Sequence, residues 1–194
     1  MGLKQTVYSV MIVSAADSFT KSVKALLSPR EFSPVVTVKG VNEAKRMLNQ
    51  RAFDFVIINA PLMGESGTKF ASTLSASSHS VVLICTAADS FAAVYEQVTP
   101  FGVFTLQKPV SNQSLMTALL WMIAARERLK QSENKEVTLE KKMQDIRNIN
   151  RAKWMLIEHE QYSEEQAHKW IEKQAMDRCV GKIVIALEII QKYG

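Results

Sequence analysis

The stretch FDFVIINAPLMGESG, Phe53–Gly67, decides the fold of the N-terminal half of the chain. Its first seven residues, ending at Asn59, form a mostly apolar run, which predicts a strand buried on both faces of a sheet. A loop containing Pro and Gly follows at once, and a helical stretch then continues to about Ser77. The stretch therefore predicts one βα unit of a parallel sheet, in which ligands lie beyond the carboxyl ends of the strands.

The same alternation of short apolar runs and amphipathic stretches extends on both sides of this unit. The five predicted strands are 8–13, 35–39, 53–59, 81–85 and 103–106. The predicted helices are 18–28, 42–49, one ending near 77, 90–97 and one beginning beyond 111, with Asp17 and Asn42 as caps of the first two. Five βα units with right-handed crossovers predict an α/β protein with a doubly wound parallel sheet.

Residues 7–125 resemble response-regulator receiver domains. The resemblance rests on the strand and loop that end at Gly67, on Thr86 after the fourth strand, and on Lys108-Pro109. It implies a flavodoxin-like sheet with the strand order 2-1-3-4-5 and a cis bond before Pro109. It also implies a regulatory site, in which an aspartate after the third strand accepts a phosphoryl group and an acidic pair after the first strand holds Mg²⁺.

The residues that carry this chemistry in the family are replaced in this sequence. Asn59 stands at the phospho-acceptor position, and Ser14 and Ala15 stand at the positions of the acidic pair. An amide does not accept a phosphoryl group as a carboxylate does, and the hard oxygen ligands of Mg²⁺ are missing. We therefore interpret the domain as a pseudo-receiver. Lys108 is then expected to bond Asn59 or Thr86 or to be solvated, unless Thr86 and Lys108 bind a small anion.

Neither Gly nor Pro occurs between Ser114 and Gly181, and helical periodicity runs through this stretch. A heptad frame places mostly apolar residues at two seam positions, with a polar centre at Ser132 and Glu136. This pattern is typical of a homodimeric coiled coil. The alternative is a single helix whose first half packs on the sheet and continues as a polar linker. The predicted seam residues are Leu115, Met122, Leu129, Leu139, Met143 and Ile146.

The last part of the chain predicts a compact unit of three helices. The first is expected to end near His159, and Ser163 with Gln166 has the pattern of a capping box that begins the second. Asp177 is the expected cap of the third helix, and Met176 is expected on the buried face of the second. Close-packing positions between the helices are expected at Ala152, Ala167, Ile171, Ala175 and Ala186.

This unit resembles the ANTAR domain, the RNA-binding module of transcription antitermination regulators. The resemblance covers roughly the last 50 residues and lies in Ala152-Lys153, Ser163–Ala167, Ile171, Ala175-Met176, Ala186 and Ile189-Ile190. The sequence departs from the family at Trp154, where glycine is usual, and at Glu172, where a basic residue is usual. The resemblance implies a regulator that binds a pair of small stem-loops in a leader RNA.

The candidate RNA contacts are exposed polar and aromatic residues of this unit. They are Arg147, Arg151, Lys153, Trp154, Lys169, Lys173, Arg178 and Lys182. Trp154 is interpreted either as a core residue or as a platform on which a loop base stacks. Residues 138–194 contain ten Lys or Arg and nine Asp or Glu, a net charge of +1. A phosphate-binding face must therefore arise from segregation of charge on the folded surface.

Whole-chain features narrow the classes of function. The net charge of +5 permits a polyanionic partner. No apolar run approaches about 18 residues, and the N-terminus lacks the apolar core of a secretion signal, so we expect a cytoplasmic protein that contacts no membrane. Cys85 and Cys179 are expected to be reduced packing residues, and no Cys or His spacing suggests zinc. We expect no cofactor, no metal and no catalytic residue.

Three regions are predicted from these patterns: a pseudo-receiver core at 1–111, an extended coiled-coil helix at 112–137, and a three-helix ANTAR domain at 138–194. Together they predict a dimeric, non-enzymatic antitermination regulator that binds structured RNA. A regulatory protein or ligand on the receiver is the expected source of control. The alternative is a pseudo-receiver scaffold that binds other proteins and no longer binds RNA.

Overall fold

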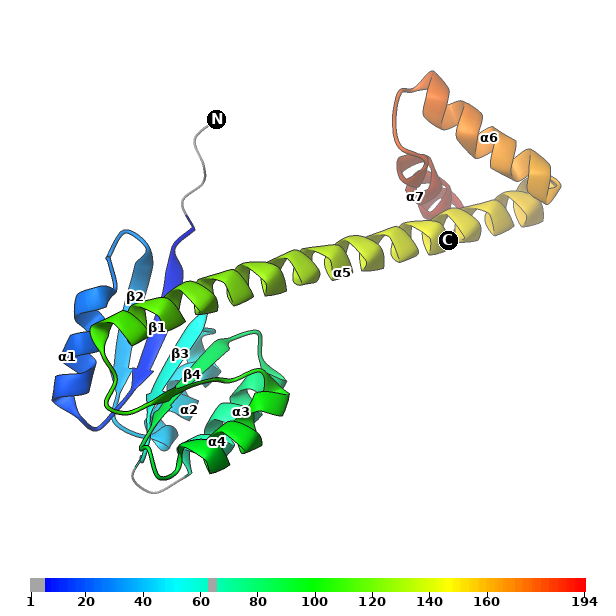
Figure 1. Cartoon of the computed structure of the whole chain (residues 1–194). Coiled ribbons are helices and arrows are strands. Elements are labelled where there is room, and N and C mark those ends of the chain that lie inside the picture. The colour runs from blue at the N-terminus through cyan, green and yellow to red at the C-terminus, as the bar shows by residue number, and fades with distance from the viewer. Residues whose placement is uncertain (1–5, 63–65) are drawn as a thin grey trace. The chain divides into compact units, whose positions relative to one another are not determined.

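A computed structural model describes residues 6–62 and 66–194 of the chain. The chain divides into two compact units, Met1–Lys130 and Gln131–Gly194 (Figure 1). One long helix, α5 (Asn112–Glu160), contributes its first part to one unit and its last part to the other.

The first unit is built on a parallel sheet with the strand order β2-β1-β3-β4-β5 (Figure 1). Its strands are β1 (Tyr8–Val13), β2 (Phe32–Val38), β3 (Phe55–Asn59), β4 (Val81–Thr86) and β5 (Phe104–Gln107). The connecting helices are α1 (Asp17–Leu26), α2 (Val41–Gln50), α3 (Gly67–Ser77) and α4 (Phe91–Val98), the last followed by a 3₁₀ turn, η1 (Thr99–Phe101). The predicted flavodoxin-like, doubly wound fold is confirmed.

Alternate side chains of the central strands enter two hydrophobic cores on opposite faces of the sheet. On one face, Val56 and Ile58 of β3 pack with residues of α2, α3 and α4. On the other face, Phe55 and Ile57 pack with residues of α1 and of the first turns of α5. All five residues of β3 are buried, as expected for a central strand of a parallel sheet that helices cover on both sides.

Two predicted helix caps are wrong. Asp17 is the first residue of α1, whose N-cap is Ala16, and Asn42 lies in the first turn of α2, whose N-cap is Gly40. The backbone at the start of α1 is instead bonded by Ser14, whose Oγ accepts from the Ala16 N–H at 3.1 Å. An acidic residue in the first turn still favours the helix electrostatically, so Asp17 stabilises α1 without capping it.

The second unit packs the last part of α5 against α6 (Glu164–Asp177) and α7 (Lys182–Tyr193). Its core contains all five alanine and isoleucine packing positions named from the sequence, together with three larger residues, Leu156, Ile185 and Ile189. The capping box at the start of α6 is confirmed. Ser163 Oγ accepts from the Gln166 N–H at 3.2 Å, and Gln166 Oε1 accepts from the Ser163 N–H at 2.8 Å.

The predicted cap at Asp177 is wrong, because Asp177 ends α6 and α7 begins only after Gly181. The chain leaves α6 through two bonds that define a Schellman motif, from Val180 N–H to Ala175 O and from Cys179 N–H to Met176 O. Cys179 takes the left-handed position of this motif, with φ 51°. This turn leaves Met176 75% exposed and Cys179 exposed, so neither is the packing residue that was expected.

Candidate functional sites

At the carboxyl edge of the sheet, the ends of β1 and β3 bring Ser14 and Asn59 into contact. Both side chains are buried, and Asn59 is only 8% exposed. Asn59 Nδ2 donates to Ser14 Oγ at 3.0 Å. Asn59 Oδ1 has no hydrogen-bond partner within residues 6–62 and 66–194. Asn59 and Ser14, which the sequence predicts at the phospho-acceptor and metal-ligand positions, are thus bonded to each other.

Lys108 and Thr86 are the other two residues that the sequence predicts for this site. Both form hydrogen bonds with groups that the sequence did not suggest. Lys108 Nζ donates to the carbonyl oxygen of Ala60, directly after β3, so the expectation that it bonds Asn59 or Thr86 is wrong. The hydroxyl of Thr86 instead hydrogen-bonds that of Ser90 at 3.3 Å. Burial lowers the pKa of Lys108 below its usual value. The bond between Lys108 and Pro109 is cis, as expected.

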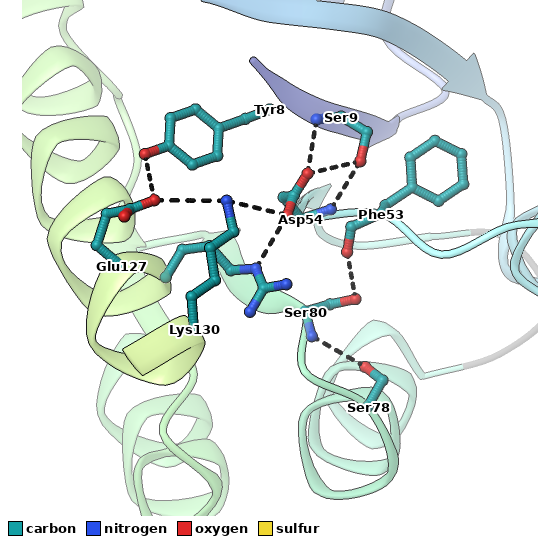
Figure 2. Close-up of polar contacts among 9 residues, drawn as sticks. Tyr8, Ser9, Phe53, Asp54, Ser78, Ser80, Glu127 and Lys130 are labelled. Carbon is teal, nitrogen blue, oxygen red and sulfur yellow. Dashed lines mark hydrogen bonds and ion pairs between the residues drawn. The ribbon is translucent and has the colours of Figure 1, made fainter. Parts of the chain in front are cut away.

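A polar cluster at the opposite edge of the sheet was not identified from the sequence. Asp54, just before β3, receives hydrogen bonds at 2.9 Å from Ser9 N–H, from Ser9 Oγ and from Arg126 Nε (Figure 2). Tyr8 OH donates to Glu127 at 2.7 Å, and Lys130 Nζ lies 4.5 Å above the Tyr8 ring. Since Arg126, Glu127 and Lys130 all belong to α5, the cluster fixes this helix to the first strands just before the boundary between the two units.

Two titrating groups in this cluster have shifted pKa values. Burial would raise the pKa of Asp54, but the hydrogen bonds from Ser9 and Arg126 and the charge of Lys130 outweigh it, so the pKa is lowered. Burial and the hydrogen bond to Glu127 raise the pKa of Tyr8 to about 12. The folded unit therefore favours an ionised Asp54 beside a protonated Tyr8.

Replacing Asp54 by Asn is expected to lower the free energy of unfolding by about 1–3 kcal/mol at neutral pH, because the partly buried Arg126 loses its charged acceptor. The pKa of Asp54 is lower in the folded chain than in the unfolded chain, where it is about 3.9. Its contribution is therefore complete above about pH 4 and is lost as the pH falls further. Urea unfolding should show the two proteins converging below about pH 4, whereas the exposed control Asp89→Asn should match the wild type throughout.

The predicted seam residues of α5 fall into two groups. Leu115 and Met122 are buried in the core beneath the sheet, so the prediction that they belong to an intermolecular seam is wrong. Their heptad spacing coincides with the face that packs on β1, β3 and β4. Leu129, Leu139, Met143 and Ile146 are exposed on α5. We call these four apolar residues the exposed seam.

The cations proposed as RNA contacts also fall into two groups. Four of them pair with carboxylates of the same unit: Lys153 with Glu164, Lys169 with Glu165, Arg178 with Glu188, and Lys182 with Glu172. The other three, Arg147, Arg151 and Lys173, have no ion pair within the described residues. The Lys153 side chain is only 16% exposed, whereas the other three pairs are exposed and contribute little to stability. Lys169, Arg178 and Lys182 can therefore contact phosphate by breaking a pair, and Arg147, Arg151 and Lys173 can do so without breaking one.

Arg147, Arg151 and Trp154 share one face of α5, because they lie at positions i, i+4 and i+7. Ala152 and Leu156 occupy the opposite face and pack in the core of the second unit. Trp154 is 70% exposed, so its interpretation as a core residue is wrong. We name Arg147, Arg151 and Trp154 the α5 stripe: two cations without ion pairs and an indole ring on one exposed surface.

Comparison with family models decides the identity of the first unit, since residues 10–120 match the response regulator receiver domain. The chain belongs to the response regulator receiver family. Residues 137–190 match the ANTAR domain. Both domains are regulatory, and their combination is that of a response-regulator-type, RNA-binding antitermination regulator at the level of the family. None of the curated proteins compared with the chain gives a match.

Solved receiver structures share the fold at low sequence identity. A signal receiver domain of an HD domain-containing protein from Pseudomonas fluorescens is 16% identical with a TM-score of 0.58, over 68% of this chain and 96% of that one. An adenylate cyclase structure from Rhodopirellula baltica is 22% identical with a TM-score of 0.59, over 70% of this chain and 98% of that one. At these identities the similarity shows the receiver fold alone.

The receiver domain of this response regulator does not fit the Mg²⁺ ion that its family implies. Ser14 Oγ is hydrogen-bonded to Asn59, and Ala15 offers no side-chain ligand atom. A pocket of about 340 Å³ at this edge is lined by Asn59, Lys108 and neighbouring residues, and no Asp or Glu lies among its described lining residues. Mg²⁺ requires an octahedral set of oxygen ligands that usually includes carboxylates.

Within the described ranges, no helix is both long and apolar enough to cross a bilayer.

Proposed function

We propose that this response regulator is a dimeric antitermination factor that binds structured RNA through its ANTAR domain, and that its receiver is a pseudo-receiver controlled without phosphorylation. The observation that carries the proposal is the α5 stripe, because an indole that is 70% exposed beside two cations without ion pairs has no role in the core of the domain. Loop bases of RNA stack on such rings, and phosphates bind such cations.

The pseudo-receiver interpretation is supported by the hydrogen bond between Asn59 and Ser14. It joins the position of the phospho-acceptor to that of a metal ligand and leaves no carboxylate at either. Phosphorylation, the usual input of the family, is then replaced by the binding of a partner to the receiver. A regulatory protein or ligand that docks on the receiver can act by masking the RNA surface or by shifting the dimer equilibrium.

Dimerisation is supported by the exposed seam of α5, formed by Leu129, Leu139, Met143 and Ile146. A long helix with exposed apolar residues at heptad spacing gains stability when a second copy covers them. The proposed regions 1–111, 112–137 and 138–194 place Leu129 in the extended helix and Leu139, Met143 and Ile146 at the start of the ANTAR domain. The dimer would place two ANTAR domains on one RNA with two stem-loops.

The double substitution Met143→Lys with Ile146→Lys is expected to convert the dimer to a monomer, because four ammonium groups would then meet at the seam. Light scattering after gel filtration should show the mass of one chain in place of two. Val137→Lys is the matched control, since Val137 is exposed on the same helix but lies outside the seam positions. A control that dissociates as well, or a double variant that stays dimeric, contradicts the proposed seam.

The proposed function is tested by the binding of unmodified protein to a labelled RNA that carries two short stem-loops. Matched duplex DNA serves as the competitor, and two salt concentrations measure the share of phosphate contacts. We expect RNA binding that weakens with salt and that exceeds DNA binding. Absence of RNA binding at micromolar concentration, both for the full chain and for residues 138–194, would contradict the proposal.

A second candidate function is a protein-interaction scaffold that has lost RNA binding. It is favoured by Glu172, which stands where a basic residue is usual and is paired with Lys182 and with His168, the latter at 3.3 Å. A carboxylate on an RNA surface repels phosphate. The same RNA-binding measurement separates the two functions.

A further inference from the structure

The second unit also contains a pocket, and no residue of the α5 stripe is among its lining residues. The end of α5, α6 and α7 converge on a hollow of about 350 Å³. Its floor is formed by three buried aliphatic side chains, those of Leu156, Ile185 and Ile189. Three of the four aromatic residues between Gln131 and Gly194 line it, namely Tyr162, Trp170 and Tyr193. An apolar floor with aromatic walls fits a flat aromatic ligand.

The Tyr193 side of this pocket is held in place by a ring outside the pocket and by a carboxylate on its rim. The Tyr193 ring is stacked on His159, with ring centroids 4.8 Å apart and an angle of 9° between the planes. The Tyr193 hydroxyl donates to Glu160. Trp170 and Gln174 project from successive turns of α6, and among the described residues no aromatic ring stacks on Trp170. The indole of Trp170 is therefore the ring against which a ligand can stack.

The rim of the pocket carries charged and hydrogen-bonding groups suited to a nucleotide. Arg178 makes a bidentate ion pair with Glu188, at 2.5 and 2.7 Å, and Lys192 lies 3.7 Å from Glu160. All four side chains are partly exposed, so their charges meet a ligand at the mouth. The two cations suit a phosphate when they exchange it for their carboxylate partners, and the released carboxylates and Gln174 can accept hydrogen bonds from amino groups of a base.

We propose that this pocket holds a single unpaired nucleobase, stacked on Trp170, with its phosphate against Arg178 and Lys192. The role of the site rests on the proposed function, since in that setting the base is extruded from a loop of the bound RNA. Recognition of splayed bases by aromatic side chains and hydrogen bonds is the usual way in which proteins read RNA loops. The α5 stripe would then supply general affinity, and the pocket would select the base.

The pocket is tested with the full chain labelled with 5-fluorotryptophan, because its three tryptophans report on three places. Trp121 reports on the receiver, Trp154 on the α5 stripe and Trp170 on the pocket, and Trp→Phe variants assign their ¹⁹F resonances. Titration with adenosine 5′-monophosphate is expected to move the Trp170 resonance saturably and to leave Trp121 unchanged. Ribose 5-phosphate, which lacks the base, should not move Trp170. No response to the nucleotide, or an equal response to ribose 5-phosphate, overturns the proposal.

A second titration with the two-stem-loop RNA separates this proposal from the proposed function. RNA that binds and moves Trp154 but not Trp170 overturns the pocket and leaves RNA binding intact. A Trp170 response to the nucleotide without any binding of RNA supports the pocket and overturns the proposed function. Gln174→Ala should weaken RNA binding by about 2- to 10-fold, as for the loss of one hydrogen bond. Gln191→Ala, on the exposed surface of α7, should leave it unchanged.

Discussion

Incubation of the purified protein with acetyl phosphate and Mg²⁺ is expected to leave its intact mass unchanged. The position of the nucleophile is an amide, Asn59, whose nitrogen donates to Ser14 Oγ. The neighbouring Ala15 adds no side-chain metal ligand, so an incoming phosphoryl group would meet the Lys108 ammonium but no carboxylate-bound metal ion at the described part of this edge. In the proposed pseudo-receiver, both the covalent acceptor and the Mg²⁺ site are therefore absent.

The matched variants separate these two deficits. Asn59→Asp alone restores a carboxylate nucleophile but no metal site, so we expect at most a trace of the phosphorylated form. The triple variant Ser14→Asp, Ala15→Asp, Asn59→Asp restores both, and we expect it to gain the mass of one phosphoryl group. Circular dichroism before the assay shows whether each variant is folded. A phosphoryl adduct on the wild-type protein would rule out the pseudo-receiver interpretation.

The receiver fold could be predicted from the sequence because its signals are local. Buried parallel strands give apolar runs such as Phe55–Asn59, and most of the loops contain Pro, Gly or Ser. The helix caps were less predictable. Asp17 and Asn42 are residue types that favour caps, but the backbone at the start of α1 is bonded by Ser14, which lies outside the helix. Which residue bonds the first backbone N–H groups of a helix depends on where the tertiary structure places it, and not on residue type alone.

The site could be predicted only where one residue decides it. Asn59, Ser14 and Ala15 are read directly from the sequence, whereas the partner of Lys108 is a backbone carbonyl that no side-chain pattern indicates. The cluster around Asp54 joins residues 72 positions apart in the chain, so no spacing pattern could indicate it. Its one sequence signal is a carboxylate inside an otherwise apolar run, directly before β3.

The seam shows how one periodicity can serve two purposes. The heptad frame is continuous from Leu115 to Ile146, but a spacing of three and four residues describes a helix face that packs on a sheet as well as one that packs on a second helix. Leu115 and Met122 pack on the sheet, while Met143 and Ile146 stay exposed. The sequence alone could not tell where along α5 the receiver ends.

Trp154→Ala is expected to weaken binding of the two-stem-loop RNA by about 5- to 150-fold, which corresponds to about 1–3 kcal/mol for the loss of one base stacked on an aromatic ring. Trp154→Tyr keeps a ring at the same position and should retain most of the affinity. Trp121→Ala is the matched control, since Trp121 is also exposed, at 57%, but belongs to the receiver. Fluorescence anisotropy with labelled RNA measures all three variants.

The mass of each variant in solution decides how this result is interpreted. Trp154 lies eight residues after Ile146, close to the exposed seam of α5, so a loss of RNA affinity could also follow from a loss of the dimer. If Trp154→Ala stays dimeric and binds RNA weakly, the indole contacts RNA directly, and the salt dependence should stay the same because no cation was removed. If the variant is monomeric, Trp154 belongs to the dimer interface, and the α5 stripe must contact RNA through Arg147 and Arg151 alone.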